Sequence, residues 1–172
     1  EASIIVYYAG HGMPDNASKD AYLLPVDGSS SSLGAAYSLK KLYTELTTYP
    51  TVKTLVFLDA CFSGDSRNGM LASGRGLSIE PNPEILHGNL IVFPATTGKQ
   101  TAHPYDDKAH GLFTYFLLLK LQETKGNVSF GELADYLNKQ VSRTSLDIKN
   151  EQTPDVNVAT EISETWKTMK LK

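Results

Sequence analysis

Three short apolar runs constrain the fold more than any other feature of the sequence. They cover residues 3–9, 54–59 and 89–94, are rich in β-branched or aromatic residues, and do not alternate cleanly between apolar and polar positions. This pattern is typical of strands that are buried on both faces of a sheet. Between the first two runs, Ser38 can act as the N-cap of a helix, because apolar residues follow it at helical spacing. A strand, a helix and a second strand in this order predict a parallel pair of strands.

Two further helices are predicted after the third run. Residues 111–123 are apolar almost all round, which indicates a well-buried helix. Ser129 and Glu132 form a capping box, which predicts the start of another helix whose inner face includes Leu133 and Val141. The chain is therefore expected to be an α/β sandwich.

The composition indicates the number of domains and disfavours some classes of partner. A chain of 172 residues that is 41% hydrophobic and 20% charged is typical of one globular domain, so we expect a single domain over residues 1–172. The net charge of −3 and the scattered lysines give no electrostatic footprint for nucleic acid. The apolar stretches are far shorter than the roughly 20 residues of a membrane span, so no membrane partner is expected. One cysteine cannot form an intrachain disulfide; localisation stays open, with the cytoplasm slightly favoured.

The start of the chain leads directly into the first apolar run. No initiator methionine or basic leader precedes this strand, so the sequence resembles an excised piece. A strand of this kind is expected inside a sheet, with partners on both sides. We therefore expect an N-terminal segment or a second chain to supply the missing sheet partners.

The first two runs each end just before a residue that can take part in catalysis. His11 follows the first run, and Cys61, the only cysteine, follows the second. Because the carboxyl ends of parallel strands meet at one edge of a sheet, we expect these side chains to lie close together. A nearby imidazole raises the thiolate fraction of a thiol. Cys61 is therefore the predicted nucleophile, and His11 the acid/base group that protonates the leaving amine.

Glycines next to these residues favour acyl transfer. Gly10 and Gly12 flank His11, and acyl transfer requires unobstructed backbone N–H donors that point at the developing oxyanion. The N–H groups of Gly12 and Cys61 are the natural pair. The alternative is a cysteine that only fills the core and a histidine that is only structural. The occurrence of both residues in matching contexts favours catalysis.

Two motifs resemble the signatures of a peptidase family. YAGHG at residues 8–12 and DACFSG at residues 59–64 are similar to the His and Cys motifs of caspase-like C14 peptidases, especially prokaryotic metacaspase-like proteins. The Asp-x-Cys form departs from the Gln-Ala-Cys form of true caspases and is similar to metacaspases and paracaspases. The likeness continues through YLLPVD at 22–27, FPAT at 93–96, HGLFTY at 110–115 and QTP at 152–154.

The resemblance implies a fold and an activity. The fold would be a caspase-like three-layer sandwich, with a mostly parallel central sheet flanked by helices. The family's first strand, helix and strand, which precede the His-bearing strand, are absent from this chain. The activity would be that of a cysteine endopeptidase of the metacaspase-like type.

The resemblance also implies a substrate class. In metacaspase-like enzymes the acidic residue two positions before the cysteine lines the S1 pocket. Asp59 holds that position, which implies cleavage after Arg or Lys, because carboxylate–guanidinium pairing is strong and directional. Asp15, Thr96 and Gln100 are further candidates for this pocket. The alternative is that Asp59 only caps local backbone N–H groups.

A loop rich in Gly and Ser follows the cysteine motif and contains Arg67 and Arg75. An enzyme that cuts after Arg would cut itself there, and the resemblance implies processing at a similar position. An ordinary exposed loop is the alternative.

No cofactor is expected. Some metacaspases require calcium, but Asp27 and Asp65 match such a site only loosely, and residues 29–32 are serines without the further carboxylates that Ca²⁺ prefers. Calcium activation is therefore only weakly supported. No cluster of Cys and His indicates zinc.

The leading hypothesis is a cysteine endopeptidase that acts on protein or peptide substrates with a basic P1 residue. One alternative is a catalytically silent caspase-like scaffold, although such scaffolds usually lack the Cys or the His. Another is a fragment that acts as a regulatory or interaction module.

Overall fold

A four-stranded sheet with the order β1-β5-β6-β9 forms the centre of the computed structural model, which describes residues 2–15, 17–28, 33–62 and 84–172. β1 (Ser3–Ala9), β5 (Lys53–Asp59) and β6 (Leu90–Pro94) are parallel. β9 (Asn157–Val158) pairs with β6 in the antiparallel sense. The predicted parallel pairing of the first two strands is confirmed.

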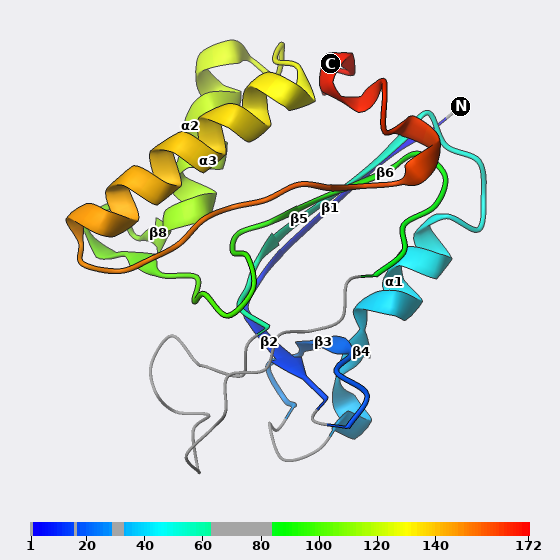
Figure 1. Cartoon of the computed structure of the whole chain (residues 1–172), viewed down its shortest axis with the longest axis horizontal. Helices are drawn as coiled ribbons and strands as arrows, with labels where there is room; N and C mark the ends of the chain where they lie inside the picture. Colours follow the sequence, from blue (N-terminus) through cyan, green and yellow to red (C-terminus); the bar gives the residue numbers. More distant parts are fainter. Residues whose placement is uncertain (1, 16, 29–32, 63–83) are drawn as a thin grey trace.

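Helices cover both faces of this sheet (Figure 1). α1 (Leu39–Leu46) lies on one face. α2 (Leu112–Thr124) and α3 (Phe130–Asp147) pack against each other on the opposite face. The predicted three-layer α/β sandwich with a mostly parallel central sheet is confirmed.

The core lies where β5 and β6 are enclosed between the helical layers. Both strands are buried almost throughout, as their continuous apolar sequences predict. The Phe57 and Phe93 rings stack with centroids 5.0 Å apart, and Phe93 meets Phe130 of α3 edge-on at 6.4 Å. Burial of each such side chain contributes roughly 1.5–3 kcal/mol, so these rings fasten α3 to the sheet.

β1 differs from its prediction. Its residues alternate between exposed and half-buried, and Ile5 and Tyr7 are 55% and 49% exposed. The strand pairs with β5 and has no second strand partner among the described residues. The expectation of a strand buried on both faces is therefore wrong for the described chain, because an apolar sequence does not specify which neighbours are present to cover it.

A small antiparallel sheet lies at the carboxyl end of β1. It consists of β2 (His11–Pro14), β3 (Ala21–Leu24) and β4 (Tyr37–Ser38), in that order. β2 begins at His11, directly after β1, and pairs with β3. The remaining short elements are β7 (Pro104–Tyr105), β8 (His110–Gly111) and the 3₁₀ helices η1 (Leu33–Ala35), η2 (Asp106–Lys108), η3 (Thr160–Ile162) and η4 (Trp166–Thr168).

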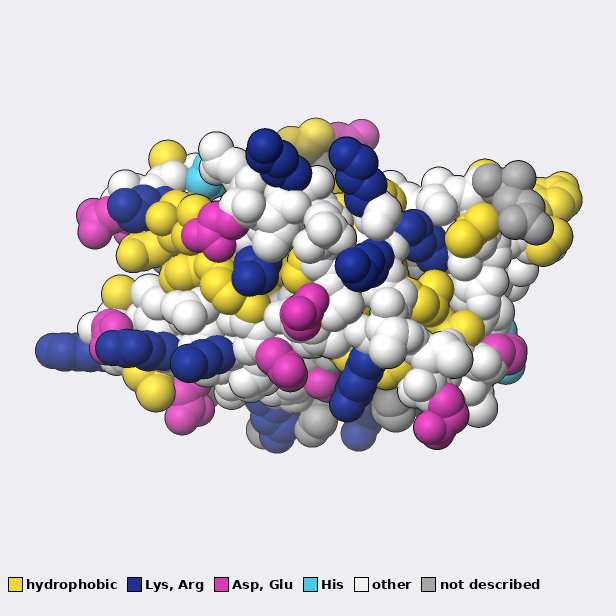
Figure 2. Space-filling model, turned by 90° about the horizontal axis from the view of Figure 1, so that it is seen from above, with side chains coloured by type: hydrophobic (Ala, Val, Ile, Leu, Met, Phe, Trp, Pro, Cys, Tyr) yellow, Lys and Arg dark blue, Asp and Glu magenta, His cyan; other side chains and the backbone are white. Residues whose placement is uncertain are grey.

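The surface carries both signs of charge. Basic side chains are interspersed with acidic and apolar ones on the face shown in Figure 2. Within the described ranges, no helix combines the length and the apolar character that crossing a membrane requires.

The predicted capping box of α3 is present. The Ser129 hydroxyl accepts a hydrogen bond from the Glu132 N–H (3.2 Å), and the Glu132 carboxylate accepts one from the Ser129 N–H (3.0 Å). We predict that Ser129→Ala lowers the free energy of unfolding by about 1 kcal/mol, because a helix N–H loses its acceptor. Urea denaturation measures the change. Ser163→Ala, which removes a hydroxyl bonded only within a surface turn, is the control and should cost clearly less; equal losses would contradict the capping role.

Candidate active site

The carboxyl ends of β1 and β5 carry the two predicted catalytic residues. The parallel register pairs Ala9 with Asp59, and the Gly10 N–H donates to the Asp59 carbonyl at 3.2 Å. His11 and Cys61 each follow this pair by two residues. Both therefore lie at the same end of the sheet, as the strand pattern predicts.

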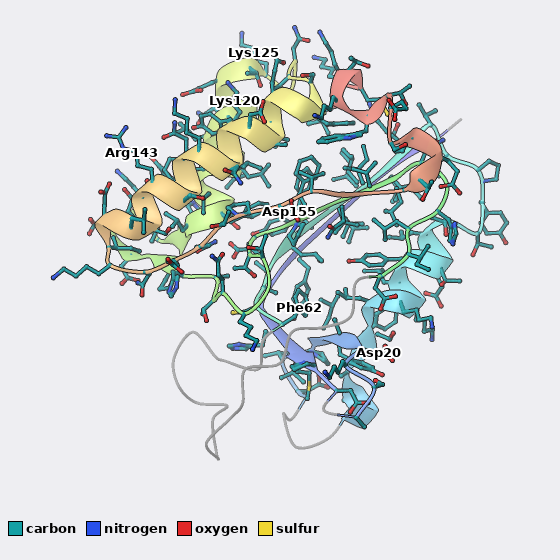
Figure 3. The ribbon with its side chains drawn as sticks, in the orientation of Figure 1. Asp20, Phe62, Lys120, Lys125, Arg143 and Asp155 are labelled. Atoms are coloured by element: carbon teal, nitrogen blue, oxygen red, sulfur yellow. The ribbon has the colours of Figure 1, made fainter. Side chains whose placement is uncertain are left out.

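Gly12 brings the His-bearing segment against the Cys-bearing one. A Cβ atom at Gly12 would lie 2.5 Å from the Cys61 carbonyl oxygen and would also overlap the Phe62 ring. Figure 3 shows Phe62 where β5 has ended and the small sheet begins. Only glycine permits this approach. The thiol side of the site is enclosed, because Cys61 is 3% exposed, whereas His11 is exposed.

The backbone of His11 is held by Tyr8. The Tyr8 hydroxyl lies 2.9 Å from the carbonyl oxygens of both His11 and Leu24 and shares its proton between them. Burial raises the pKa of this phenol above its ordinary value, so the group remains a donor. Gly10 lets the ring pass, since a Cβ there would lie 2.7 Å from the hydroxyl oxygen.

The sulfur of Cys61 has a backbone donor. The Ala102 N–H donates to Sγ at 3.4 Å, in a buried setting. Ala102 belongs to the segment that follows β6, so the chain beyond the third parallel strand also reaches the sulfur. A donor directed at the sulfur favours its anionic form.

Asp59 lies beneath the site and is 1% exposed. Its carboxylate accepts hydrogen bonds from the Thr114 hydroxyl (2.5 Å) and the Thr114 N–H (3.3 Å). Thr114 is in the first turn of α2, whose N-cap Gly111 supplies no side chain, so Asp59 caps this helix from β5. The helix dipole favours the negative charge there. Asp59 therefore caps a backbone N–H, on a distant helix rather than locally, while its role in S1 stays a prediction.

Asp15 and Gln100, two other candidates for S1, are engaged elsewhere. The Asp15 carboxylate lies in the turn between β2 and β3, and hydrogen bonds from Ser18 and Ala17 lower its pKa. The Gln100 side-chain oxygen accepts from the Thr153 N–H at 2.7 Å.

Thr96 lines a cavity of about 390 Å³ together with Phe62 and Asp155. This cavity therefore extends to Phe62, the residue after Cys61. Arg67, Arg75 and Asp65 lie outside the described residues, so their predicted roles stay predictions.

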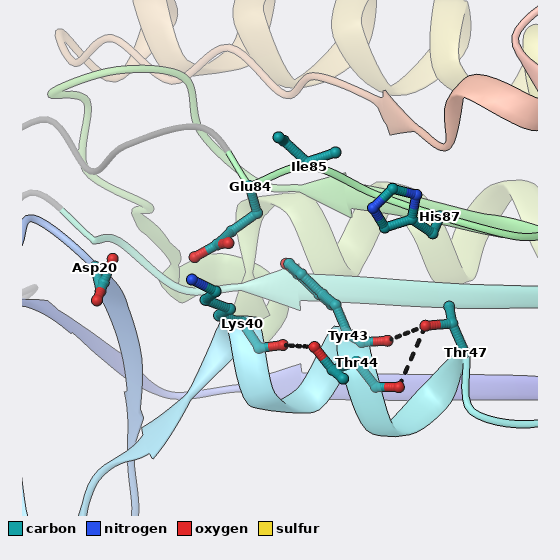
Figure 4. A pocket seen from close by; sticks show the side chains of 8 residues that line it. All are labelled: Asp20, Lys40, Tyr43, Thr44, Thr47, Glu84, Ile85 and His87. Carbon is teal, nitrogen blue, oxygen red and sulfur yellow. Dashed lines mark hydrogen bonds between the residues drawn. The ribbon is translucent and has the colours of Figure 1, made fainter.

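A second cavity of about 490 Å³ lies beside α1, shares Tyr43 and Glu84 with the first, and is lined by neither His11 nor Cys61. Lys40 extends along it toward Glu84, with Asp20 nearby (Figure 4). Burial and the Asp20 charge raise the pKa of Glu84, and Lys40 opposes this shift.

Among the residues that the structure describes, no group of three or more His, Cys, Asp or Glu side chains is placed to hold a metal ion.

Tyr8, Ala102 and Thr114 support the site, although sequence patterns did not single them out. Tyr8 and Thr114 lie inside the motifs at 8–12 and 110–115, which was the available signal. Ala102 contributes only a backbone N–H, which no residue type reveals.

The mostly parallel sheet between two helical layers is the architecture of a caspase-like domain. The family model of the caspase domain, peptidase C14, matches residues 1–163. The chain therefore belongs to the peptidase C14 family, a family of cysteine peptidases.

Solved structures share the fold at low sequence identity. A protein from Geobacter sulfurreducens has 18% identity and a TM-score of 0.61, with 97% of this chain and 69% of the other covered. Caspase-1 from Spodoptera frugiperda has 16% identity and a TM-score of 0.58, with 91% of this chain and 59% of that chain covered. No curated protein sequence is significantly similar to the chain.

The contact between Gly111 and Asp59 yields a stability prediction. A Cβ at Gly111 would overlap the buried Asp59 carboxylate, although φ −63° and ψ 147° suit alanine. Gly111→Ala should therefore lower the free energy of unfolding by about 1–3 kcal/mol. In an Asp59→Ala background the same change should cost much less, because the overlapping group is gone. An equal cost in both backgrounds, measured by chemical denaturation, would show that the overlap is not the cause.

Proposed function

We propose that this chain is a cysteine endopeptidase of the metacaspase-like type that cleaves peptide bonds after Arg or Lys. The observation that carries the proposal is the parallel register of β1 and β5. It places His11 and Cys61 two residues beyond one strand pair, with Gly12 packed against the Cys61 carbonyl. Membership in the C14 family supports the same chemistry.

The proposed reaction is acyl transfer through a thioester. The Cys61 thiolate attacks the scissile carbonyl carbon, and the N–H groups of Gly12 and Cys61 stabilise the oxyanion that forms. His11 gives its proton to the leaving amine as the C–N bond breaks. A water molecule then attacks the thioester while His11 accepts its proton, which releases the acid and regenerates Cys61.

Asp59 is the proposed determinant of the P1 residue. It is a carboxylate two residues before the nucleophile, at the base of the site and in a largely desolvated position. A long guanidinium side chain that enters beside Cys61 would meet this carboxylate, and such pairs are strong when they are shielded from water. Asp59 would then serve both P1 recognition and the capping of α2.

Catalytic variants test the proposed reaction. We expect hydrolysis of fluorogenic peptides with P1 Arg and, less well, P1 Lys, and no hydrolysis with P1 Asp. Cys61→Ala or His11→Ala should lower kcat/KM by more than about 1,000-fold. Absence of Cys61-dependent cleavage of any of these peptides would instead support the silent scaffold or the interaction module.

A conservative variant tests the P1 determinant separately. Asp59→Asn keeps an acceptor for Thr114 but removes the charge, and should lower kcat/KM for P1 Arg by at least roughly 30-fold. Asp135→Asn, an exposed change on α3, is the control for the loss of one negative charge and should have little effect. Equal effects of both variants, or a preference for P1 Asp, would contradict the role of Asp59.

Self-processing after Arg67 or Arg75 is also proposed, on the basis of the specificity above. Intact-mass measurement after prolonged incubation should detect fragments that end at one of these residues. The fragments should be missing from Cys61→Ala protein and from the Arg67→Gln/Arg75→Gln double variant. Intact mass of a preparation that cleaves peptides would contradict self-processing.

The edge position of β1, which pairs only with β5 among the described residues, supports a partner. A strand edge with exposed apolar side chains such as Ile5 and Tyr7 is a template for further pairing. We propose that an N-terminal segment or a second chain pairs there and completes the sheet.

A further inference from the structure

Gln152 is a fully buried polar residue (0% exposed) whose amide joins two ends of one segment. Its Oε1 accepts a hydrogen bond from the His103 N–H at 2.8 Å. Its Nε2 donates to the Ala95 carbonyl at 3.2 Å. A single side chain thus ties the beginning and the end of residues 95–103, the segment that follows β6.

The backbone of Gln152 is itself fixed from α3. Its N–H donates to the Ser145 hydroxyl at 3.1 Å, and that hydroxyl donates to the Ser142 carbonyl of α3 at 2.9 Å. Ser145 is 1% exposed and lies in the last turns of α3. The backbone of Gln152 is therefore fixed to α3, which defines the position of its side-chain amide.

The segment that Gln152 ties carries the backbone donor to the nucleophile. Ala102, next to His103, donates its N–H to the Cys61 sulfur at 3.4 Å and is fully buried. The position of this N–H depends on the position of the adjoining peptide, whose N–H is held by Gln152. We infer that Gln152 is a positioning residue of the proposed peptidase, which holds the 95–103 segment so that the Ala102 N–H stays directed at the Cys61 thiolate.

The chemistry of this position requires both a donor and an acceptor. A buried carbonyl and a backbone N–H without partners are costly, so the chain would move to satisfy them if the amide were lost. Of the uncharged side chains long enough to span both groups, glutamine supplies an N–H donor and a carbonyl acceptor together. The hydrogen bonds of Gln152 can therefore be tested separately from the volume that its side chain fills.

A near-isosteric variant tests the inference. Gln152→Met keeps the length of the side chain but removes both hydrogen bonds. The variant should weaken the hydrogen bond from the Ala102 N–H to the charged Cys61 thiolate. The midpoint of the pH profile for alkylation of Cys61 by iodoacetamide should therefore rise by about one to two pH units. We expect kcat at neutral pH to fall about tenfold or more, with KM changed less than threefold. Ser163→Ala removes a hydroxyl that is bonded only to Thr160 in a surface turn, outside the 95–103 segment and its partners, and should move neither quantity.

A second variant covers the outcome in which Gln152→Met does not fold. A protonated Glu at this position donates to the Ala95 carbonyl and accepts from the His103 N–H, as the amide does, whereas its carboxylate cannot donate. Burial raises the pH at which such a carboxyl ionises. Gln152→Glu should therefore approach wild-type kcat at acidic pH and lose activity relative to wild type as pH rises. A constant ratio of the two activities across pH would overturn the inference.

Failure of this inference is distinguishable from failure of the proposed function, on which it rests. Alkylation reports the surroundings of Cys61 whether or not peptides are cleaved. If peptides are cleaved but the alkylation midpoint of folded Gln152→Met equals that of wild type, Gln152 only stabilises the fold and the inference is wrong. If the midpoint rises while no peptide is cleaved by the wild type, the endopeptidase proposal fails and the positioning of the thiol stands.

Discussion

The parallel pairing of β1 with β5 is the constraint on which the candidate site depends. A shift of one residue would turn every side chain of β1 to the opposite face and would change the position of His11 relative to Cys61. Two tyrosines oppose such a shift. The Tyr7 hydroxyl contacts Thr114 Oγ1 of α2 at 2.7 Å on one face, and Tyr8 bonds to the His11 carbonyl on the other. Hydrogen bonds on both faces of β1 therefore oppose a change in its register with β5.

Thr114 connects this register to the interior. Its hydroxyl donates to the Asp59 carboxylate and accepts from Tyr7, so one short chain of hydrogen bonds links β1, α2 and β5. Buried chains of this kind strengthen one another and are costly to break in part. Asp59 is consequently a structural support of the site whether or not it also binds the P1 side chain.

The features of the fold that depend on local sequence pattern could be predicted from the sequence. The apolar runs of β5 and β6, the capping box at Ser129 and the placement of His11 and Cys61 after parallel strands are confirmed in position. The exposed position of β1 was not predictable, because composition does not specify neighbours. The hydrogen bonds of Gln152 were not predictable either, since its partner His103 lies 49 residues away and non-periodic hydrogen bonds leave no sequence pattern.

In the proposed enzyme, the register of β1 and β5 assembles His11 and Cys61 into one thiol-based site. Covalent labelling with a peptidyl acyloxymethyl ketone that has Arg at P1 tests it most directly, because this weak electrophile requires an activated thiol. Peptide mapping by mass spectrometry should find one adduct, on Cys61, and His11→Ala should slow its formation at least roughly 100-fold. Equal labelling rates in the two proteins, or folded wild-type protein that is not labelled at Cys61, would show that His11 and Cys61 do not form such a site.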